Sequence, residues 1–469
     1  WDFDGVRRAA RQQWNTYLSK IDIDTKDNDQ RTMFYTALYH TGMQPNLFTD
    51  ADGRYFGMDL KPHQGRVDEP IYTIFSLWDT FRAYHPLMTI IDPELNEAFI
   101  RSLIQKSREG GVLPMWELAG NYTGTMIGYH AASLIADSYV KGYRNFDVQE
   151  AYKACLRTAE YDTTGIITHP LVVPHLMPQA KYWKNKIGYV PCDKDNESVA
   201  KALEYAYDDF VLSQVAKLLQ KDEDYKLLAA RALNYRNVID PATGYAQGRH
   251  ADGTFLKEAN AFQFAKFITE GAPCHYTWYA PQDPYGLMEC MGGRQHYVEK
   301  LDSMFSAQRY WHGNEPCHQV AFIFNYAGQP WKTQQAVRHI MATEYLNAPG
   351  GLSGNDDAGQ MSAWYIFASL GFYPVCPGSP YYVLASPSFS KATLHLENGK
   401  TFTLQAENTS KENIYIQQVT LNGKPYTRNY ITHKDITEGS EMVFVMGNMP
   451  NKTWGSSPED CPPSLIEKF

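Results

Sequence analysis

The last predicted helix of the chain, residues 358–371, is introduced by Gly354-Asn355-Asp356-Asp357-Ala358-Gly359-Gln360-Met361-Ser362-Ala363-Trp364. Two adjacent acids lie between glycines there, and glycine lets the backbone take tight turns with positive φ. Neighbouring carboxylates repel each other unless a proton, a cation or the hydroxyls of a substrate compensate. An acid at a helix start can also be an N-cap, which is the commoner case. Asp356 and Asp357 are therefore candidates both for capping and for catalysis.

Segments with helical periodicity occupy most of the chain before this helix. They cover residues 4–21, 28–43, 71–90, 93–108, 124–140, 148–163, 195–219, 222–238, 259–271, 283–288, 294–307, 315–326 and 330–343. Loops that contain Gly, Pro or Asp separate them, and no repeat of fixed period is present. Long helices in up-and-down order predict a mainly α fold, an α/α toroid in which one face of each helix packs against an inner ring.

The pattern changes near residue 375. Alternation with the two-residue period of strands follows, in residues 381–385, 391–396, 401–406, 414–421 and 442–446. Asn-Gly turns punctuate these strands, and this dipeptide is a strong hairpin signal. We therefore expect a helical domain over residues 1–375 and a C-terminal all-β region over residues 376–469. The β region is expected to be part of a sandwich whose other strands lie upstream of Trp1.

Composition argues against several classes of partner and site. The net charge is −9 and no long basic run is present, whereas nucleic-acid binding requires clustered Lys and Arg. No apolar run reaches the roughly 18 residues that a transmembrane helix needs. The seven cysteines are scattered without CxxC pairs, which argues against a disulfide framework or a zinc site. The 33 Tyr, 10 Trp and 22 Phe suit sugar rings, although most of them are expected in the core.

Two loops combine an aromatic residue with an acid. In the first, Ser76-Leu77-Trp78-Asp79-Thr80-Phe81-Arg82, Trp78 could be a platform for a sugar and Asp79 could accept hydrogen bonds from its hydroxyls. Asp79 and Arg82 are three residues apart on one helix face, so they could equally pair only with each other. The second loop, residues 110–117, ends in Trp116-Glu117 and repeats the combination.

Two further loops are candidates for an acid and for a metal site. Glu270 lies directly before a Gly-Ala-Pro break and the aromatic segment that ends at Trp278. A carboxyl in an apolar pocket has a raised pKa, as a general acid requires, whereas a surface turn is the simpler reading. Residues 312–318, His-Gly-Asn-Glu-Pro-Cys-His, do not have the spacing of a zinc helix. Asn314 and Glu315 instead offer the oxygen ligands that Ca²⁺ prefers.

Taken together and in this order, the motifs resemble glycoside hydrolase family 92. They are residues 76–82, 110–117, 188–199, 269–271, 312–316 and 354–364. The resemblance extends from about Trp1 to the C-terminus, and it implies a calcium-dependent, inverting exo-α-mannosidase. It also implies an (α/α)6 catalytic domain preceded by an N-terminal β-sandwich domain that this chain lacks. A periplasmic, extracellular or cell-surface location follows from the same resemblance.

The resemblance also assigns roles to residues. Glu270 matches the general acid and Asp357 the favoured general base, with Asp356 beside it. Calcium would bind the O2 and O3 hydroxyls of the terminal mannose, with Asn314 and Glu315 as expected ligands. The residues expected to bind the sugar are Trp78, Asp79, Arg82, Trp116, Glu117, Trp278 and His312.

Two departures from the family pattern lie on the side of the leaving group. The family pattern Glu-Gly-Asn-Ala-Trp-Gln-Tyr appears in this chain as Glu270-Gly271-Ala272-Pro273-Cys274-His275-Tyr276. The loop between Met304 and His312 is also shorter than expected for the family. The linkage preference is therefore open. Two other functions also remain open: another inverting (α/α)6 hydrolase such as a glucosidase, and a non-catalytic glycan-binding protein.

Overall fold

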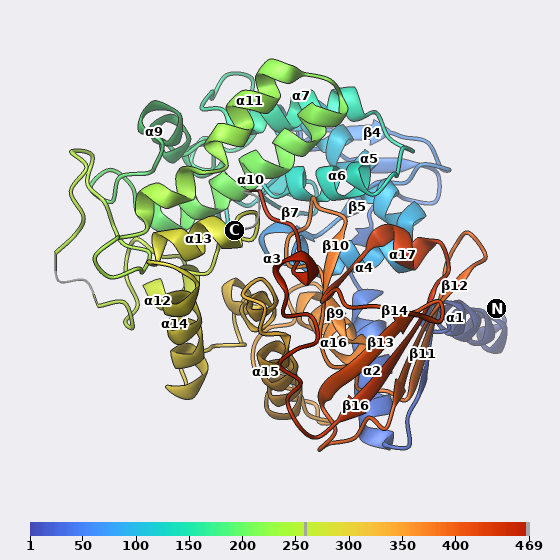
Figure 1. Cartoon of the computed structure of the whole chain (residues 1–469). Helices are drawn as coiled ribbons and strands as arrows, with labels where there is room; N and C mark the ends of the chain where they lie inside the picture. The colour runs from blue at the N-terminus through green and yellow to red at the C-terminus, as the bar shows by residue number, and fades with distance from the viewer. Residues whose placement is uncertain (258–259, 466–469) are drawn as a thin grey trace.

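Helices form the larger part of the molecule, and a sheet forms the rest (Figure 1). The computed structural model describes residues 1–257 and 260–465. Its α-helices are α1 (Phe3–Leu18), α2 (Asn28–Thr41), α3 (Leu77–Thr80), α4 (Tyr84–Ile91), α5 (Pro93–Gly110), α6 (Ala131–Val140), α7 (Val148–Ala159), α8 (Val173–Leu176), α9 (Ala180–Ile187), α10 (Ser198–Leu218), α11 (Asp222–Arg231), α12 (Pro273–Tyr276), α13 (Pro284–Cys290), α14 (Arg294–Ser306), α15 (Pro330–Thr343), α16 (Gln360–Leu370) and α17 (His433–Thr437). The 3-10 helices are η1 (Asn234–Val238), η2 (Glu315–Cys317), η3 (Val320–Asn325) and η4 (Pro458–Asp460).

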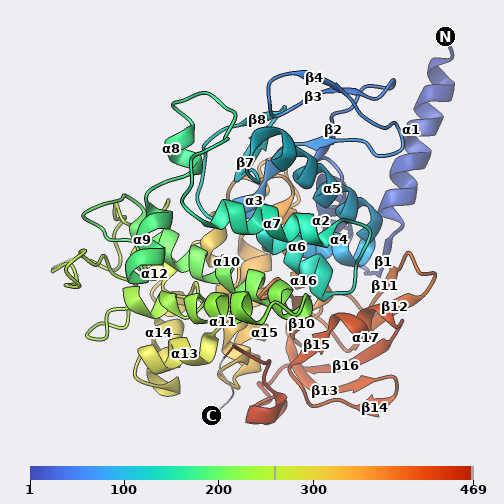
Figure 2. The same ribbon diagram turned by 90° about the horizontal axis from the view of Figure 1, so that it is seen from above.

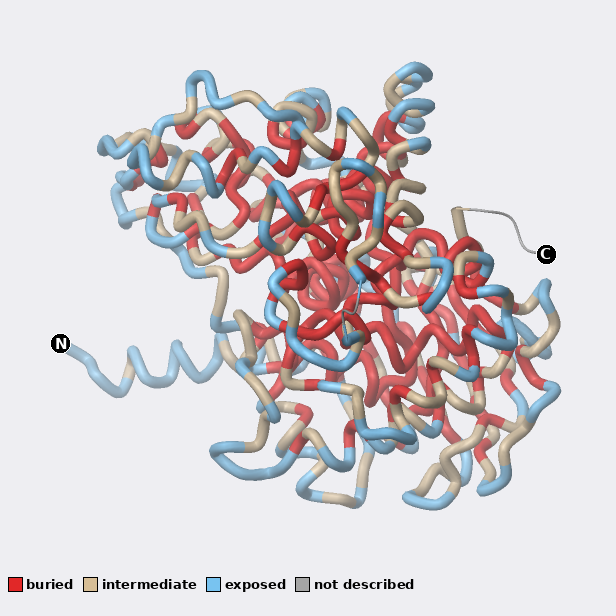
Figure 3. The backbone as a smooth tube through the Cα atoms, turned by 90° about the vertical axis from the view of Figure 1, so that its left-hand side faces the viewer, coloured by how far each residue is buried: buried red, intermediate tan, exposed pale blue. Residues whose placement is uncertain are grey.

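The strands fall into a long C-terminal series and several short early pairs. They are β1 (Ile21–Asp24), β2 (Asn46–Leu47), β3 (Arg54–Phe56), β4 (Pro62–Gln64), β5 (Tyr72–Thr73), β6 (Phe75–Ser76), β7 (Trp116–Leu118), β8 (Asn121–Tyr122), β9 (Phe372–Tyr373), β10 (Tyr381–Leu384), β11 (Lys391–His395), β12 (Thr401–Glu407), β13 (Tyr415–Leu421), β14 (Lys424–Pro425), β15 (Tyr430–Thr432) and β16 (Glu441–Gly447). One buried hydrophobic cluster extends from Ile21 to Cys461 and so includes both the helices and the sheet. In Figure 3 the buried backbone accordingly fills the middle of the molecule.

Several predicted helices differ from the structure: residues 124–130 precede α6 as a loop, residues 234–238 form η1, and three further segments depart more strongly. Residues 71–90 begin with β5 and β6, because Ile74 has a φ of 67° and interrupts any helix there. In the predicted helix 259–271, residue 259 lies outside the described residues and the rest forms turns. Phe267 and Ile268 of this segment are buried, whereas Phe262 and Phe264 are exposed. Residues 315–326 form the tighter helices η2 and η3 instead of one α-helix.

Helix α10 lies at the centre of the helical part, in contact with α6, α7, α9 and α11. It is buried along most of its length and yet carries three acids, Glu204, Asp208 and Asp209, that are at most 1% exposed. Asp209 accepts hydrogen bonds of 3.0 Å from Lys184, and Asp208 contacts His130 at 2.8 Å. Buried charges are tolerated only when they are paired in this way.

The largest sheet has the strand order β1-β11-β12-β16-β13-β14. Strands β12 and β16 are parallel, while the other neighbours are antiparallel. Alternate residues of β12 and β16 are buried, as expected for a sheet with one face on the core. Its first strand comes from the N-terminal part of the chain, where Ile21 pairs with Leu394. The sheet therefore crosses the boundary predicted at residue 375.

Helix α1 projects from the body of the molecule and has no buried residue (Figure 2). It is also amphipathic, as the sequence predicted, with Trp14 and Tyr17 turned toward α2. Within the described residues, no helix is both long and apolar enough to cross a bilayer.

Two loops reach the start of α16 through a contact between glycine backbones. A Cβ atom added to Gly354 would lie 2.3 Å from the carbonyl oxygen of Gly313, a distance that real Cβ atoms essentially never show. Gln360 then fixes the first turn of α16, because its Oε1 accepts hydrogen bonds from the backbone N–H groups of Ala83 and Tyr84. Loops 311–315 and 353–357 and the segment after α3 are thereby held together.

This glycine contact predicts that Gly354→Ala is destabilising. The new methyl group would push two backbones apart, at an expected cost of about 1–3 kcal/mol. Gly350→Ala is the matched control in the same loop, since a Cβ there would meet nothing within 4 Å. Urea unfolding of both variants measures the difference. Equal stability of the two variants would contradict the close packing of these loops.

Candidate active site

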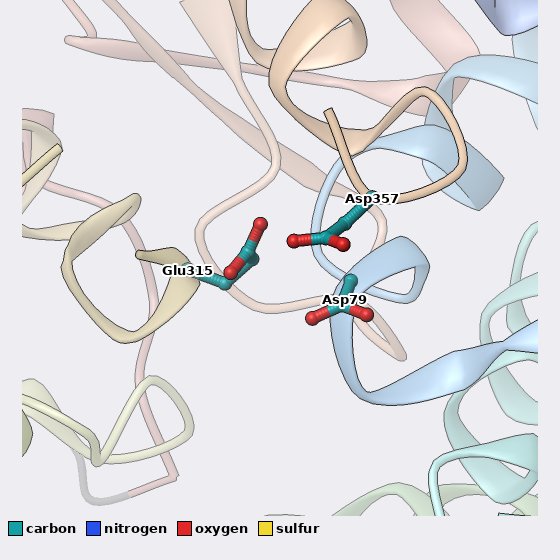
Figure 4. A group of neighbouring side chains, drawn as sticks. All are labelled: Asp79, Glu315 and Asp357. Carbon is teal, nitrogen blue, oxygen red and sulfur yellow. The ribbon is translucent and has the colours of Figure 1, made fainter. Parts of the chain in front are cut away.

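Three carboxylates from distant parts of the sequence meet in one place (Figure 4). Asp79 lies on α3, Glu315 opens η2, and Asp357 lies in the turn before α16. One carboxylate oxygen from each lies within 4.8 Å of the others. The contact between loops 311–315 and 353–357, together with the attachment of Gln360 behind α3, brings the three elements that carry these acids together. We call Asp79, Glu315 and Asp357 the acidic triad.

Two members of the acidic triad carry buried oxygens without a hydrogen-bond partner. Asp79 is 3% exposed, and its Oδ2 accepts a short hydrogen bond from the Ser76 hydroxyl while its Oδ1 has no partner. Glu315 is 1% exposed, and its Oε2 has no partner. An unsatisfied buried acceptor is costly and needs an explanation. Both oxygens belong to the same cluster, where they could serve as ligands of a cation.

Burial raises the pKa of all three acids, repulsion within the triad adds to the rise for Asp79 and Glu315, and for Asp357 a hydrogen bond with Glu315 opposes it. Loss of solvent is the largest cause for each acid. The charge of Asp357 raises the pKa of Asp79 further, and the charge of Asp79 raises the pKa of Glu315 further. The guanidinium of Arg82 opposes both of these shifts. It is itself buried against the rings of Trp78, Phe81 and Tyr279. One arginine thus acts on two of the three acids, and the three carboxylates together could bind a further cation.

The acidic triad fits a calcium ion. Ca²⁺ binds carboxylate and carbonyl oxygens, and it would satisfy the two partnerless oxygens and reduce the repulsion among the acids. Of the two residues predicted as ligands, Glu315 lies in the triad. The Asn314 amide instead donates a 3.0 Å hydrogen bond to the backbone carbonyl of Glu270. Asp79, predicted as a contact to the sugar, and Asp357, predicted as the base, take part in this cluster.

Glu270 lies near the acidic triad with an exposed side chain. Partial burial and then the charge of Asp357 raise its pKa, so that its protonated form is favoured over that of an ordinary glutamate. Its φ is 48°, and that of Asp357 is 47°. A non-glycine residue in the left-handed region is strained, and such residues are frequent at functional sites.

Asp356 faces away from the triad. Its Oδ1 accepts a 2.9 Å hydrogen bond from the backbone N–H of Ser362 in α16, and its Oδ2 lies 3.4 Å from Nδ1 of His40. It lines a cavity of about 610 Å³ next to α2 together with His40. Of the two adjacent acids, Asp356 thus stabilises the start of the helix and Asp357 points into the site.

Several residues predicted to bind the sugar are buried, and contact with a sugar stays a prediction for them. Glu117 is fully buried, and its carboxylate contacts Lys106 at 2.9 Å. Trp78 donates through its indole N–H to Glu204 at 2.9 Å, and His312 lies between the hydroxyls of Tyr310 and Tyr345 at 2.8 and 2.7 Å. Trp278 packs edge to face against Tyr297.

Trp116 alone among these aromatic side chains remains partly exposed in the described structure. It lies across the β6–β7 pair from Ser76, the residue whose hydroxyl bonds to Asp79. It is therefore the sugar-binding candidate that remains accessible beside the acidic triad.

Glu204 contacts several side chains next to the acidic triad, although the sequence did not predict it as a functional residue. Its carboxylate accepts hydrogen bonds from Trp78 and from the Tyr276 hydroxyl, contacts His130 at 3.0 Å and lies 3.8 Å from Arg82. Burial alone would lower the pKa of His130, but the charges of Asp208 and Glu204 raise it to about 9. The signal in the sequence was the presence of acids inside an otherwise apolar helix, residues 198–218.

Known proteins of one family resemble this chain in sequence and in fold. The glycosyl hydrolase family 92 catalytic domain matches residues 1–448. A family GH92 α-mannosidase of Bacteroides thetaiotaomicron is 39% identical, with a TM-score of 0.93 over 99% of this chain and 62% of that one. A second structure of it, in complex with mannoimidazole, has a TM-score of 0.91 and 38% identity over the same shares.

A family GH92 inverting mannosidase of the same organism is 34% identical, with a TM-score of 0.93 over 99% of this chain and 65% of that chain. An uncharacterized secreted glycosidase of Arthroderma benhamiae is 27% identical over 99% of this chain and 59% of its own length. The chain thus spans about three fifths of the length of these relatives. It belongs to glycosyl hydrolase family 92.

Proposed function

We propose that the protein is an exo-acting α-mannosidase that hydrolyses terminal α-mannosyl linkages of glycans with inversion. Glu270 is the proposed general acid, Asp357 the proposed general base, and Ca²⁺ the proposed metal. The observation that carries the proposal is the position of the acidic triad beside Glu270 in a chain of this family. The structure in complex with mannoimidazole, obtained for a relative, supports mannose as the sugar.

In the proposed reaction Glu270 donates its proton to the oxygen of the leaving group. Its raised pKa and its exposed position suit a residue that must be protonated near neutral pH and must reach a substrate. Asp357 takes a proton from the water that attacks the opposite face of the sugar. One of its two oxygens would contribute to the metal site with Asp79 and Glu315, while the other would orient that water.

Asp79 and Glu315 would hold the calcium ion from the buried side, through the oxygens that have no other partner. When bound, the ion supplies positive charge for hydroxyls of the sugar and favours a flattened ring. Arg82 remains beneath the triad, where its charge limits the repulsion among the acids.

The finer architecture and the location belong to the same proposal. We infer that the helical part is an (α/α)6 toroid and that the whole protein has an N-terminal β-sandwich domain. Family membership supports this inference. The relative named as a secreted glycosidase supports an extracellular or periplasmic location.

Two other functions compete with this proposal. A glycan-binding protein would have no need for the strained backbone at both Glu270 and Asp357, nor for the raised pKa of both carboxyls. An inverting glucosidase would use the same acids. Rates of hydrolysis of mannosides and of glucosides distinguish it from a mannosidase.

The role of Glu270 as the acid predicts a difference between substrates in the Glu270→Gln variant. With an α-linked mannobiose, kcat/KM should fall by about 10²–10⁴, the usual contribution of general acid catalysis. With α-mannosyl fluoride the fall should be much smaller, because fluoride leaves without being protonated. Asp357→Asn should lower both activities, since each substrate needs the activated water.

NMR of the first product formed from α-mannosyl fluoride by the unmodified chain should show β-mannose, as inversion requires. Equal losses with both substrates in Glu270→Gln would contradict its role as the acid. Glucosides cleaved faster than mannosides would contradict the sugar assignment.

The acidic triad predicts calcium binding that can be measured without activity. Calcium at 100 times its Kd should stabilise the chain by about 2.7 kcal/mol. Asp79→Asn and Glu315→Gln should each weaken the calcium affinity at least tenfold in calorimetry, because each removes a charged ligand. Glu299→Gln, a change to an exposed carboxylate on α14, is the control. Unchanged affinity in both triad variants would place the ion elsewhere.

A further inference from the structure

Exposed aromatic side chains gather beside Glu270. Phe264 is 69% exposed, Phe262 is 43% exposed, and Trp311 is 38% exposed. Most large aromatic residues of the chain are buried, so these three are exceptions. Apolar surface gathered in one place usually marks a binding surface.

The ring contacts show that Phe264 and Trp311 form one surface with His275. The ring centroids of Phe264 and Trp311 are 5.9 Å apart, those of His275 and Trp311 are 5.8 Å apart, and those of Phe264 and His275 are 6.4 Å apart. We call Phe264, His275 and Trp311 the aromatic platform. Its members come from two loops, residues 260–271 with the adjoining α12 and residues 309–315.

His275 holds the aromatic platform in place. Its Nδ1 accepts a 3.1 Å hydrogen bond from the backbone N–H of Ala272, and it also bonds to the backbone of Arg309. Burial lowers its pKa, so the ring is neutral near pH 7 and serves as a fixed support. Arg309 extends this surface, with its guanidinium carbon 3.6 Å from the centroid of the Phe262 ring.

The platform is tied to the residues proposed to act in catalysis. The backbone N–H of Ala265 donates to the carbonyl of Gly271, the residue after Glu270. Asn314 donates to the carbonyl of Glu270 itself. The indole of Trp311 passes beside Gly313, the glycine that contacts Gly354 near Asp357. The platform therefore adjoins the loop of the proposed acid and the loop of the proposed base.

We propose that the aromatic platform is the subsite for the leaving group and that it stacks a pyranose ring of the glycan. The proposal rests on the proposed function, because a general acid must lie next to the oxygen that leaves. The acidic triad closes the site on its buried side, so the leaving sugar must extend from Glu270 toward solvent, where the platform lies.

The chemistry of the surface suits a sugar. One face of a pyranose presents C–H groups that pack on an aromatic ring, while its hydroxyls need donors and acceptors at the edge. The Trp311 indole N–H and the Arg309 guanidinium supply donors near these rings. Two of its three members also lie where the sequence departs from the family pattern: His275 in residues 270–276 and Trp311 in the shortened loop before His312.

The test compares substrates that do and do not place a sugar on the platform. Phe264→Ala and Trp311→Ala are assayed on the α-1,2, α-1,3, α-1,4 and α-1,6 mannobioses and on α-mannosyl fluoride. For the disaccharide that the unmodified chain cleaves best, we expect kcat/KM to fall at least tenfold, and at least tenfold more than with the fluoride. Trp311→Phe should recover most of the loss, because it retains a flat ring.

The control variant is Phe3→Ala, which removes an exposed phenylalanine from α1, away from the site. It should leave both activities at the level of the unmodified chain. Equal losses on the disaccharide and on the fluoride would overturn the subsite, since the platform would then only support the loop of Glu270. Unchanged disaccharide kinetics would overturn it as well, and the exposed rings would then serve another macromolecule.

Failure of the proposed function gives a different result. If the unmodified chain cleaves neither α-mannosyl fluoride nor any mannobiose, the mannosidase proposal itself fails. Cleavage of both by the unmodified chain, with no preferential loss in the platform variants, would leave the mannosidase proposal standing and remove only the subsite.

Discussion

The repulsion among Asp79, Glu315 and Asp357 is the constraint on which the rest of this structure depends. Three acids with raised pKa values, two of them almost without solvent, would separate unless the surrounding chain held them. The glycine contact between loops 311–315 and 353–357 and the bonds from Gln360 to the segment after α3 provide that hold. The fold therefore holds the three carboxylates together against their electrostatic repulsion, and a bound cation would reduce that repulsion.

A second layer of buried charge supports the first. Glu204 on α10 contacts Trp78, Tyr276 and His130 and lies near Arg82. Arg82 lies 3.8 Å from Glu204, and its charge opposes the rise in the pKa of Asp79 and Glu315, so it links the central helix electrostatically to the acidic triad. Buried networks of this kind fix side chains in one arrangement, provided that every member has a partner.

The opposite side of the site has a different character. Glu270, Phe264 and Trp311 are exposed and lie on loops, while the partly buried His275 lies on the short helix α12. The buried triad is suited to hold a metal and the terminal sugar, which are the constant parts of the proposed reaction. The exposed loops are suited to differences in the leaving group, since loops accept changes in sequence that a packed core does not.

The sequence by itself determined the order of the motifs, the two adjacent acids before α16 and the strands after residue 375. These features are local, because helical period, strand alternation and glycine turns depend on neighbouring residues. Only the tertiary structure decided that Asp79 joins Glu315 and Asp357, that Asp356 turns away, and that Trp78, Glu117, Trp278 and His312 are buried. It also decided that β1 joins the C-terminal sheet and that residues 260–271 form a loop with exposed rings. The physical reason is that burial and the meeting of charges depend on packing between segments far apart in the chain, which no local pattern records.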